Sequence, residues 1–375
     1  MRRVQHQTVQ FPQPARQQRR PPTPSHPDLC ARTLRVLLRR YGAGEPLSCV
    51  PLSQGLLNHG YRLATTRGRF FLKHHLDGDP EAIGRQHRAT ALLGALGIPV
   101  VPPVSDVEGR TVAVVGDRCY ALHPWIEGRH RHGSELTTAQ SRRLGALLGQ
   151  VHTRLAQVIP AAAAPAHPSA DPSDTHALIG ELLVRIRARK APDSFDALAE
   201  YRLLERRALL HDVAGQRPPE GAEPVAGWVH GDFHPLNLLY RHTDPDSPGS
   251  PGDPDDSGGP GEPLAIVDWD RLGVQPRAEE AVRAAAIFFV RPDGTLDLPR
   301  VRAYARAYRH AAHASPDELS AAVHRVWWER LNDFWMLCWR YELSDGRADP
   351  QFPAAASLVV WWTREYAAVR GAFCD

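Results

Sequence analysis

The pattern of apolar and polar positions divides the chain into a part rich in short strands and a longer part rich in helices. Apolar residues recur every three or four positions over 31–41, which predicts a helix that Gly42 ends. Between 51 and 124 the pattern changes to short strand-like runs with one helical stretch among them. The expected strands are 60–65, 69–74, 111–115 and 119–122, and the expected helix is 81–96. This part predicts a small mixed lobe with an antiparallel sheet.

After Pro124 the helical period dominates. One apolar helix face is formed by Leu144, Leu147, Leu148, Val151 and Leu155. Further helices are expected up to about 213 and then at 276–290, 299–313, 315–343 and 353–371. A short strand pair is expected from the apolar runs that flank a polar segment, 238–240 and 264–267. The chain therefore predicts an α+β fold with two lobes, a small one at 28–124 and a larger, mostly helical one at 125–375.

Two segments have no apolar periodicity, and we expect both to be disordered. Residues 1–27 hold six Gln, six Pro, five Arg and no acid, which is typical of a basic tail. Residues 242–262 hold six acids and neither Lys nor Arg. Because this acidic segment separates the two apolar runs of the strand pair, it is predicted to be an expanded hairpin loop.

Composition excludes several classes of protein. The 375 residues are 42% apolar and carry a net charge of +3, which suits a soluble globular protein and not a dedicated nucleic-acid binder. The longest apolar run, about 284–290, is far shorter than a membrane helix of ~20 residues. The five cysteines are scattered without CxxC spacing, which argues against disulfides and thiolate zinc sites and favours the cytoplasm. We expect a monomer or a dimer, with neither nucleic acid nor membrane as a partner.

The residues that point to chemistry lie in the segments 228–240 and 266–270. Asp232 precedes Asn237 by five residues, and a short apolar run ends in Asp268 and Asp270. Phosphoryl transfer needs a group that orients the attacking hydroxyl and groups that hold Mg²⁺ on the phosphates. Protein kinases use the same Asp-to-Asn spacing in their catalytic loop. Carboxylate and amide oxygens are hard ligands that suit Mg²⁺.

These two segments, His230-Gly231-Asp232 through Asn237 and Asp268-Trp269-Asp270, resemble the motifs of the aminoglycoside phosphotransferase family, which includes choline kinases. Four other segments also resemble that family: 52–58, 68–73 (GRFFLK), 124–128 and 144–152. The resemblance implies a bilobal protein-kinase-like fold. It also implies transfer of the γ-phosphate of ATP, with Mg²⁺, to a hydroxyl of a small molecule such as an antibiotic or a metabolite.

The resemblance further implies roles for individual residues. Asp232 matches the catalytic base, and Lys73 matches the lysine that binds the α/β-phosphates; only one other lysine, Lys190, occurs among 45 basic residues. The matches to metal ligands are Asn237, Asp268 and Asp270. The matches to other nucleotide-binding positions are Ser53, Gly55 and Asn58 in the first hairpin and Leu122, Pro124 and Trp125 at the hinge.

The sequence departs from the family pattern in two places. The helix after Lys73 should present a Glu to that lysine, but the residue at this position is Gln86. The segment after Asp270 should reach an Asp at the start of a helix, and Glu279 or Glu280 takes its place. Three other features favour packing over chemistry: His230 is expected to brace its loop, His152 to be a core histidine, and the tryptophans at 327–362 to be core residues.

Two other functions stay open at this point. The departure at Gln86 is compatible with a pseudokinase that binds nucleotide without turnover. His230, Asp232 and His234 have a spacing that would also suit a metallohydrolase, with Asp268 bridging to a second metal. The acceptor is not defined, since residues 270–375 carry 14 acids and 14 arginines and so do not favour a polycation over a neutral or singly charged alcohol.

Overall fold

The computed structural model describes residues 29–52, 58–76, 78–163, 168–219, 224–241 and 262–375. Asp28, the tail at 1–27 and all but the last residue of the 242–262 insert lie outside them. The N-terminal part is a five-stranded sheet in which every neighbouring pair is antiparallel, in the order β1-β2-β3-β5-β4. The strands are β1 Pro46–Leu52, β2 His59–Thr65, β3 Gly68–His75, β4 Ala113–Val115 and β5 Arg118–Pro124.

The first strand was not expected from the sequence. β1 contains Pro46 and Pro51, which lack the backbone N–H that a central strand needs. It pairs only with β2, with Cys49 opposite Leu63, and so forms the edge of the sheet, where proline is tolerated. The sequence of β1 has no apolar alternation that would predict a strand. Its strand conformation is evident only from the hydrogen-bonded pairing with β2.

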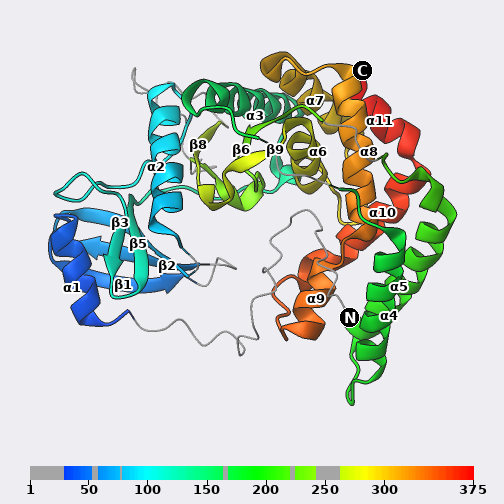
Figure 1. Ribbon diagram of the computed structural model, residues 1–375, viewed down its shortest axis with the longest axis horizontal. Helices are drawn as coiled ribbons and strands as arrows, with labels where there is room; N and C mark the ends of the chain where they lie inside the picture. Colours follow the sequence, from blue (N-terminus) through cyan, green and yellow to red (C-terminus); the bar gives the residue numbers. More distant parts are fainter. Residues whose placement is uncertain (1–28, 53–57, 77, 164–167, 220–223, 242–261) are drawn as a thin grey trace, which may run out of the picture.

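Two helices pack on this sheet (Figure 1), and both agree with the predicted ranges. Helix α1, Ala31–Arg40, buries Leu34, Leu37 and Leu38, and its N-cap is Cys30. Helix α2, Pro80–Ala95, begins where the Asp79 carboxylate accepts from two main-chain N–H groups, and Gly97 follows its end with φ of +82°. α2 lies between the sheet and the C-terminal part of the molecule.

The C-terminal part is mostly helical, as expected. Its helices are α3 Thr138–Val158, α4 Pro172–Arg187, α5 Ser194–Val213, α6 Arg277–Phe288, α7 Leu298–Ala312, α8 Pro316–Asn332, α9 Trp335–Glu342, α10 Phe352–Arg364 and α11 Tyr366–Cys374. Short 3₁₀ turns lie at η1 Gly133–Glu135, η2 Ala214–Gln216, η3 Pro235–Asn237, η4 Trp269–Arg271 and η5 Asp349–Gln351. Together with the N-terminal sheet, they confirm the α+β class.

Two of the predicted helices are each divided in the structure. The range 315–343 contains α8 and α9, because Asp333 accepts from the N–H of Trp335 at 3.0 Å and so starts a new helix. The range 353–371 contains α10 and α11, which meet at Glu365. Five of the six tryptophans at 327–362 are buried, as expected, and Trp327, Trp328 and Trp362 are fully so, whereas Trp361 is partly buried.

Two short strand pairs lie where the two parts of the molecule meet. β7 Leu238–Tyr240 pairs with β8 Pro263–Ile266, as expected, and β6 Ala226–Val229 pairs with β9 Gly273–Pro276, which was not expected. Ile266 also donates its N–H to Pro99 O at 2.7 Å, so β8 is joined to the chain that leaves α2. These pairs place the segments 230–237 and 267–272 side by side.

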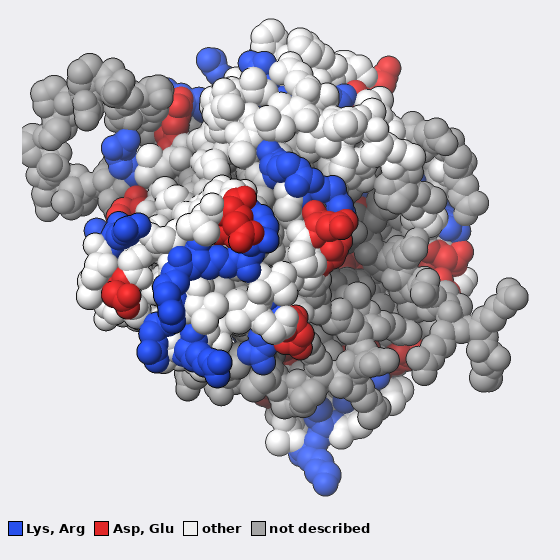
Figure 2. Space-filling view, turned by 60° about the vertical axis from the view of Figure 1, so that its left-hand side comes forward, with Lys and Arg blue, Asp and Glu red and all other residues white. Residues whose placement is uncertain are grey.

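The surface carries charge of both signs. In the view of Figure 2, in which the left-hand side of Figure 1 comes forward, basic and acidic side chains are both present. Among the described residues, no helix combines the length and the apolar character needed to cross a membrane.

Candidate active site

The loop after β6 turns sharply at Gly231, which has φ of +84°. A Cβ atom at this position would lie 2.2 Å from the carbonyl oxygen of Arg271, so only glycine fits. His230 braces the loop with both ring nitrogens: Nδ1 accepts from the N–H of Asp232 at 3.2 Å, and Nε2 lies 3.0 Å from Val267 O. Burial lowers the pKa of His230 and keeps the ring neutral. The expected bracing role agrees with this geometry.

Glu280, on α6, supports the same loop from the other side. Its carboxylate accepts from the N–H of Gly231 at 2.5 Å and from the N–H of His230 at 3.3 Å. Nε2 of His152 lies 2.6 Å from its second oxygen, so His152 is the core histidine that the sequence predicts. Glu279 lies instead beside Arg283 and Arg325. Of the two acids that were candidates for the family's Asp, Glu280 is therefore the one that contacts the loop.

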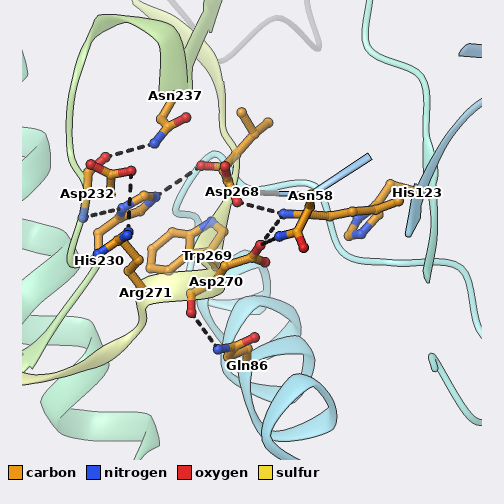
Figure 3. Close-up of polar contacts among 12 residues, drawn as sticks. Asn58, Gln86, His123, His230, Asp232, Asn237, Asp268, Trp269, Asp270 and Arg271 are labelled. Atoms are coloured by element: carbon orange, nitrogen blue, oxygen red, sulfur yellow. Dashed lines mark hydrogen bonds and ion pairs between the residues drawn. The ribbon is translucent and has the colours of Figure 1, made fainter. Parts of the chain in front are cut away.

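Asp232 and Asn237 are brought together by this loop (Figure 3). The amide nitrogen of Asn237 donates to the main-chain oxygen of Asp232 at 2.8 Å. The Asp232 carboxylate is 18% exposed, with Nε2 of His234 at 3.5 Å and Nε of Arg271 at 3.9 Å. This side chain is therefore a partly accessible carboxylate between two nitrogen donors.

Asp268 lies beside Asn237 because of strand pairing. Leu238 is opposite Ile266 in the β7–β8 pair, and Val267 donates its N–H to Asn237 O at 2.9 Å. Asp268 has φ of 62°, in the left-handed region that residues other than glycine rarely adopt. Such strain is typical of functional sites, where it turns a side chain in a direction that a strand would not allow.

Lys73, on β3, contacts both acids of the second motif. Its Nζ lies 2.6 Å from an oxygen of Asp268 and 2.6 Å from an oxygen of Asp270. Although burial disfavours the ammonium, the two carboxylates outweigh that effect and raise the pKa of Lys73. Burial also opposes ionisation of Asp268, but attraction to Lys73 lowers the pKa of that carboxyl, whereas burial and the neighbouring charge of Asp268 raise the pKa of Asp270.

Two amide side chains hold Asp270 in place. Asn58 donates to Oδ2 of Asp270 at 2.5 Å and accepts from the N–H of Leu76 at 3.0 Å. Gln86, on α2, donates to the main-chain oxygen of Asp270 at 2.8 Å. The sequence led us to consider Gln86 as a partner of Lys73, but its hydrogen bond goes to Asp270 because both acids already occupy the ammonium. Figure 3 shows these contacts converging on Asp270.

The other residues expected to bind nucleotide are placed differently. Ser53 and Gly55 lie outside the described residues. Leu122 is 1% exposed and packs in the core of the N-terminal part, so its side chain faces away from solvent. Pro124 ends β5 and is exposed, and the partly buried Trp125 stacks under Arg62, with the guanidinium carbon 5.8 Å from the ring centre.

Sequence reasoning did not assign Arg271 to the site, and it considered His234 only as a ligand of a metallohydrolase. Two signals were available: His234 is two residues after Asp232, and Arg271 directly follows the Asp268-Trp269-Asp270 motif. The chelate of the alternative metallohydrolase does not fit, because both ring nitrogens of His230 are used within the protein. Within the ranges given above, no group of three or more His, Cys, Asp and Glu side chains is placed to bind a metal ion.

The ligand chemistry of the remaining donors fits a hard cation. The amide nitrogen of Asn237 is committed to Asp232, so the amide oxygen is the atom of Asn237 left for a metal. Asp268 adds carboxylate oxygens next to it, and Asp270 adds others. An all-oxygen set of this kind suits Mg²⁺.

Several solved structures resemble this chain in fold, and two of the three described here hold a nucleotide. An amicoumacin kinase in complex with AMP-PNP, Ca²⁺ and Ami is 16% identical, with a TM-score of 0.56 and coverage of 91% of this chain and 92% of that one. A spectinomycin phosphotransferase in complex with ADP and spectinomycin is 15% identical, with a TM-score of 0.57 and coverage of 92% and 98%. A microcompartment-associated aminopropanol kinase is 16% identical, with a TM-score of 0.56 and coverage of 91% and 99%.

These likenesses confirm the expected kinase-like fold. No curated protein matches the chain in sequence. The sequence model of the phosphotransferase enzyme family, in contrast, matches residues 48–249, a range that includes Lys73, Asp232 and Asn237. More than half of the chain is matched in this way, and the chain therefore belongs to the phosphotransferase enzyme family.

Proposed function

We propose that this protein is an ATP-dependent phosphotransferase that moves the γ-phosphate of ATP to a hydroxyl of a small molecule. The observation that carries the proposal is the meeting of Lys73, Asp232, Asn237 and Asp268 at one place, from segments up to 195 residues apart in the chain. Phosphoryl transfer requires a lysine for the phosphates, a carboxylate for the acceptor and oxygen ligands for Mg²⁺, and these residues supply all three.

Asp232 is the proposed base. Its partly exposed carboxylate accepts the proton of the acceptor hydroxyl as that oxygen attacks the γ-phosphorus. The new P–O bond forms as the bond between the γ-phosphorus and the bridging oxygen breaks, and ADP leaves with the electron pair of that bond. The loop contacts of His230 and Glu280 hold the carboxylate in this position.

Asn237, Asp268 and Asp270 are the proposed ligands of Mg²⁺, which neutralises charge on the phosphates. Lys73 is the proposed ligand of the α/β-phosphates, and it moves from the two acids to the nucleotide as Mg·ATP enters. The proposed base and the proposed metal ligands are all present, and this supports catalysis over the pseudokinase alternative. The lack of the family Glu at position 86 does not leave Asp270 unsupported, since Asn58 and Gln86 both donate to it.

The acceptor is proposed to be a small hydroxylated antibiotic or metabolite, since related folds hold amicoumacin or spectinomycin ligands. We further propose a cytoplasmic monomer or dimer that acts without nucleic acid or membrane. The five cysteines are free thiols, which suits a reducing compartment.

An ATP-consumption screen tests this function. Purified protein with Mg·ATP is offered hydroxylated metabolites and antibiotics, and ADP is measured against the same panel with Asp232→Asn. We expect at least one acceptor to raise ADP production with the wild type alone, and mass spectrometry to show a product heavier by one phosphoryl group. Binding of Mg·ATP without turnover of any acceptor would favour the pseudokinase instead.

A further inference from the structure

A pocket lies between helices α5, α9 and α10, which come together in the lower right part of the molecule in Figure 1. None of the proposed catalytic or metal-binding residues lines it. Part of the lining is apolar and is formed by the buried side chains of Leu203, Leu337, Phe352 and Val359. The charged part of the lining comes from Arg202, Arg206, Arg330 and Asp333. The pocket therefore combines an apolar surface with an excess of basic groups.

Arg206 is the exceptional residue of this lining. It is only 6% exposed, and although burial lowers the pKa of its guanidinium to about 10, the group stays protonated at neutral pH. Among the described residues, its hydrogen bonds all come from Nη1, which donates to two carbonyls in the last turn of α8, Arg330 O at 2.5 Å and Leu331 O at 3.1 Å. No acid in the described ranges forms an ion pair with it. A buried charge without a counter-ion is destabilising, so this geometry favours a bound anion.

The charges around Arg206 do not supply that counter-ion. Arg202 is matched by Glu205, whose carboxylate lies 2.6 Å from Nη1 of Arg202. Asp333 and Glu205 are close enough to favour the charge of Arg206, but neither lies within ion-pair distance of it. Apart from the matched Arg202, the lining then holds two arginines, Arg206 and Arg330, and one acid, Asp333. A ligand with a single negative charge would balance these three groups.

We propose that this pocket binds a small organic monocarboxylate. Nη1 of Arg206 is used by α8, so Nε and Nη2 form the edge of the guanidinium that is left for a ligand, and two parallel N–H groups match the two oxygens of a carboxylate. The ring of Phe334 lies under the guanidinium, with its centre 5.3 Å from the guanidinium carbon, and helps to fix the plane of this edge. The apolar residues of the lining contact the carbon body of the ligand. A few polar groups in an apolar pocket are typical of sites for small molecules.

Calorimetric titration of the full chain with matched pairs of compounds tests the site. Benzoate and benzamide have the same shape, but only benzoate is charged, and butyrate with butyramide forms a second pair with a smaller body. Since hydrogen bonds to a charged group are stronger than those to a neutral one, the better-fitting acid should bind at least about tenfold more tightly than its amide. Equal affinities within both pairs, or no binding of either acid, would overturn the proposal.

Two variants place the carboxylate at Arg206. Arg206→Gln keeps a donor for the α8 carbonyls but lacks the charge and the planar fork, so it should lose the preference for the acid over the amide. Arg187→Gln is the control, because Arg187 pairs with Glu200 and does not line the pocket. A preference that survives in Arg206→Gln would show that the acid binds elsewhere.

Asp333→Asn gives a second test that does not depend on the folding of the Arg206 variant. Its amide oxygen can still accept from the N–H of Trp335, but the negative charge beside the ligand is removed. The acid should therefore bind about tenfold more tightly than to the wild type, while the amide binds equally to both. Unchanged or weaker binding of the acid would overturn the site.

The carboxylate could belong to the phosphoryl acceptor or to a separate ligand, and one further arm distinguishes these sources. 4-(Hydroxymethyl)benzoate carries both a carboxylate and an alcohol, and it is incubated with Mg·ATP and analysed by mass spectrometry. A phosphorylated product that Arg206→Gln does not form would assign the pocket to the acceptor, whereas binding without a product would assign it to a separate ligand. The titrations need no turnover, so they succeed or fail independently of the proposed phosphoryl transfer.

Discussion

Nε2 of His152 lies 2.6 Å from Oε2 of Glu280, and this buried pair joins α3 to α6 directly behind the loop that carries Asp232. Nδ1 of the same histidine lies 3.1 Å from the hydroxyl of Tyr308 on α7. Attraction to His152 outweighs the effect of burial and lowers the pKa of Glu280, so the acid is ionised when it accepts from Gly231 and His230. The position of Asp232 therefore depends on helices that do not themselves contact the reacting groups.

Replacing Glu280 with Ala should lower both stability and turnover. The change leaves the N–H groups of His230 and Gly231 without their acceptor, and each unsatisfied group costs about 1–3 kcal/mol of unfolding free energy. Glu279→Ala is the matched control, because Glu279 is equally buried but lies beside Arg283 and Arg325. At a temperature where both variants are folded, kcat should fall at least about tenfold for Glu280→Ala only; equal kcat values would contradict this role.

Asp232→Asn should lower kcat by a factor on the order of 10² or more, since general base catalysis typically contributes that much. Calorimetry should show unchanged affinity for Mg·ATP, because Asn237, Asp268 and Asp270 are intact in this variant. Full turnover on the acceptor found by the screen would mean that another group takes the hydroxyl proton.

Lys73→Ala and Asp268→Asn should weaken nucleotide binding in distinguishable ways. Loss of Lys73 removes a cation from the phosphates, so binding of ATP should weaken with and without Mg²⁺. Loss of the Asp268 charge removes a metal ligand, so only the Mg²⁺-dependent part of the affinity should fall. Lys73→Arg should restore little, because the planar guanidinium cannot reproduce the point contact that Nζ makes with both acids. Calorimetric titrations of ATP with and without EDTA separate these cases.

Mild acid should destabilise the N-terminal part. Burial lowers the pKa values of four histidines there from 6.5 to about 4 (His74), about 2 (His75), about 3 (His87) and about 4 (His123). As the pH falls through 6.5, the unfolded chain binds protons at these residues and the folded chain does not. The free energy of unfolding is therefore highest above pH 6.5, as far as these histidines are concerned, and decreases as the pH falls. The raised pKa values of Asp270 and Asp333 act in the opposite direction, but two acids are outnumbered by four histidines.

Urea unfolding at pH 8, 6.5 and 5 measures this effect. His75→Leu is the informative variant, since Nε2 of His75 is buried without a hydrogen-bond partner. Its unfolding free energy should fall less than that of the wild type between pH 8 and pH 5, by up to ~1.4 kcal/mol per pH unit. An identical pH dependence in the two proteins would exclude His75 as a source of acid sensitivity.

Replacing residues 242–262 with an Asn-Gly turn should leave the melting temperature and ATP turnover nearly unchanged. β7 and β8 already pair, with Leu239 opposite Ala265 and Tyr240 opposite Pro263, so Arg241 and the two new residues form a three-residue hairpin loop between paired ends. Differential scanning fluorimetry and the ADP assay provide the two values. A loss of activity with an unchanged melting temperature would show that the acidic insert contributes to the site.

Local signals in the sequence were sufficient for much of the fold. Helix α2 was predicted to within a residue at each end, and Gly97-Ile98-Pro99 marks its end. The β7–β8 pair was predicted because two apolar runs flank a polar insert. The positions of Asp232, Asn237 and Asp268 in one site followed from motif spacing and the family resemblance.

What the sequence did not reveal depends on contacts between distant residues. The β6–β9 pair joins 226–229 to 273–276, two four-residue segments with no pattern of their own. Gln86 donates to a main-chain oxygen 184 residues away, a contact that no side-chain motif encodes. The break between α8 and α9 at Asp333 was missed because the helical spacing of apolar residues continues across it. The hydrogen bond from the N–H of Trp335 to the Asp333 carboxylate, which starts the new helix, is visible only in the structure.

The double contact of Lys73 also affects the order in which the active site is loaded. Without nucleotide, Asp268 and Asp270 already have a tethered counter-ion, so a free divalent ion has to compete with an ammonium that cannot diffuse away. A nucleotide that arrives with its metal would remove this competition, because Lys73 could bind the triphosphate while Asp268 and Asp270 hold the metal. Such an exchange of the two cations would leave neither Asp268 nor Asp270 without a positive partner.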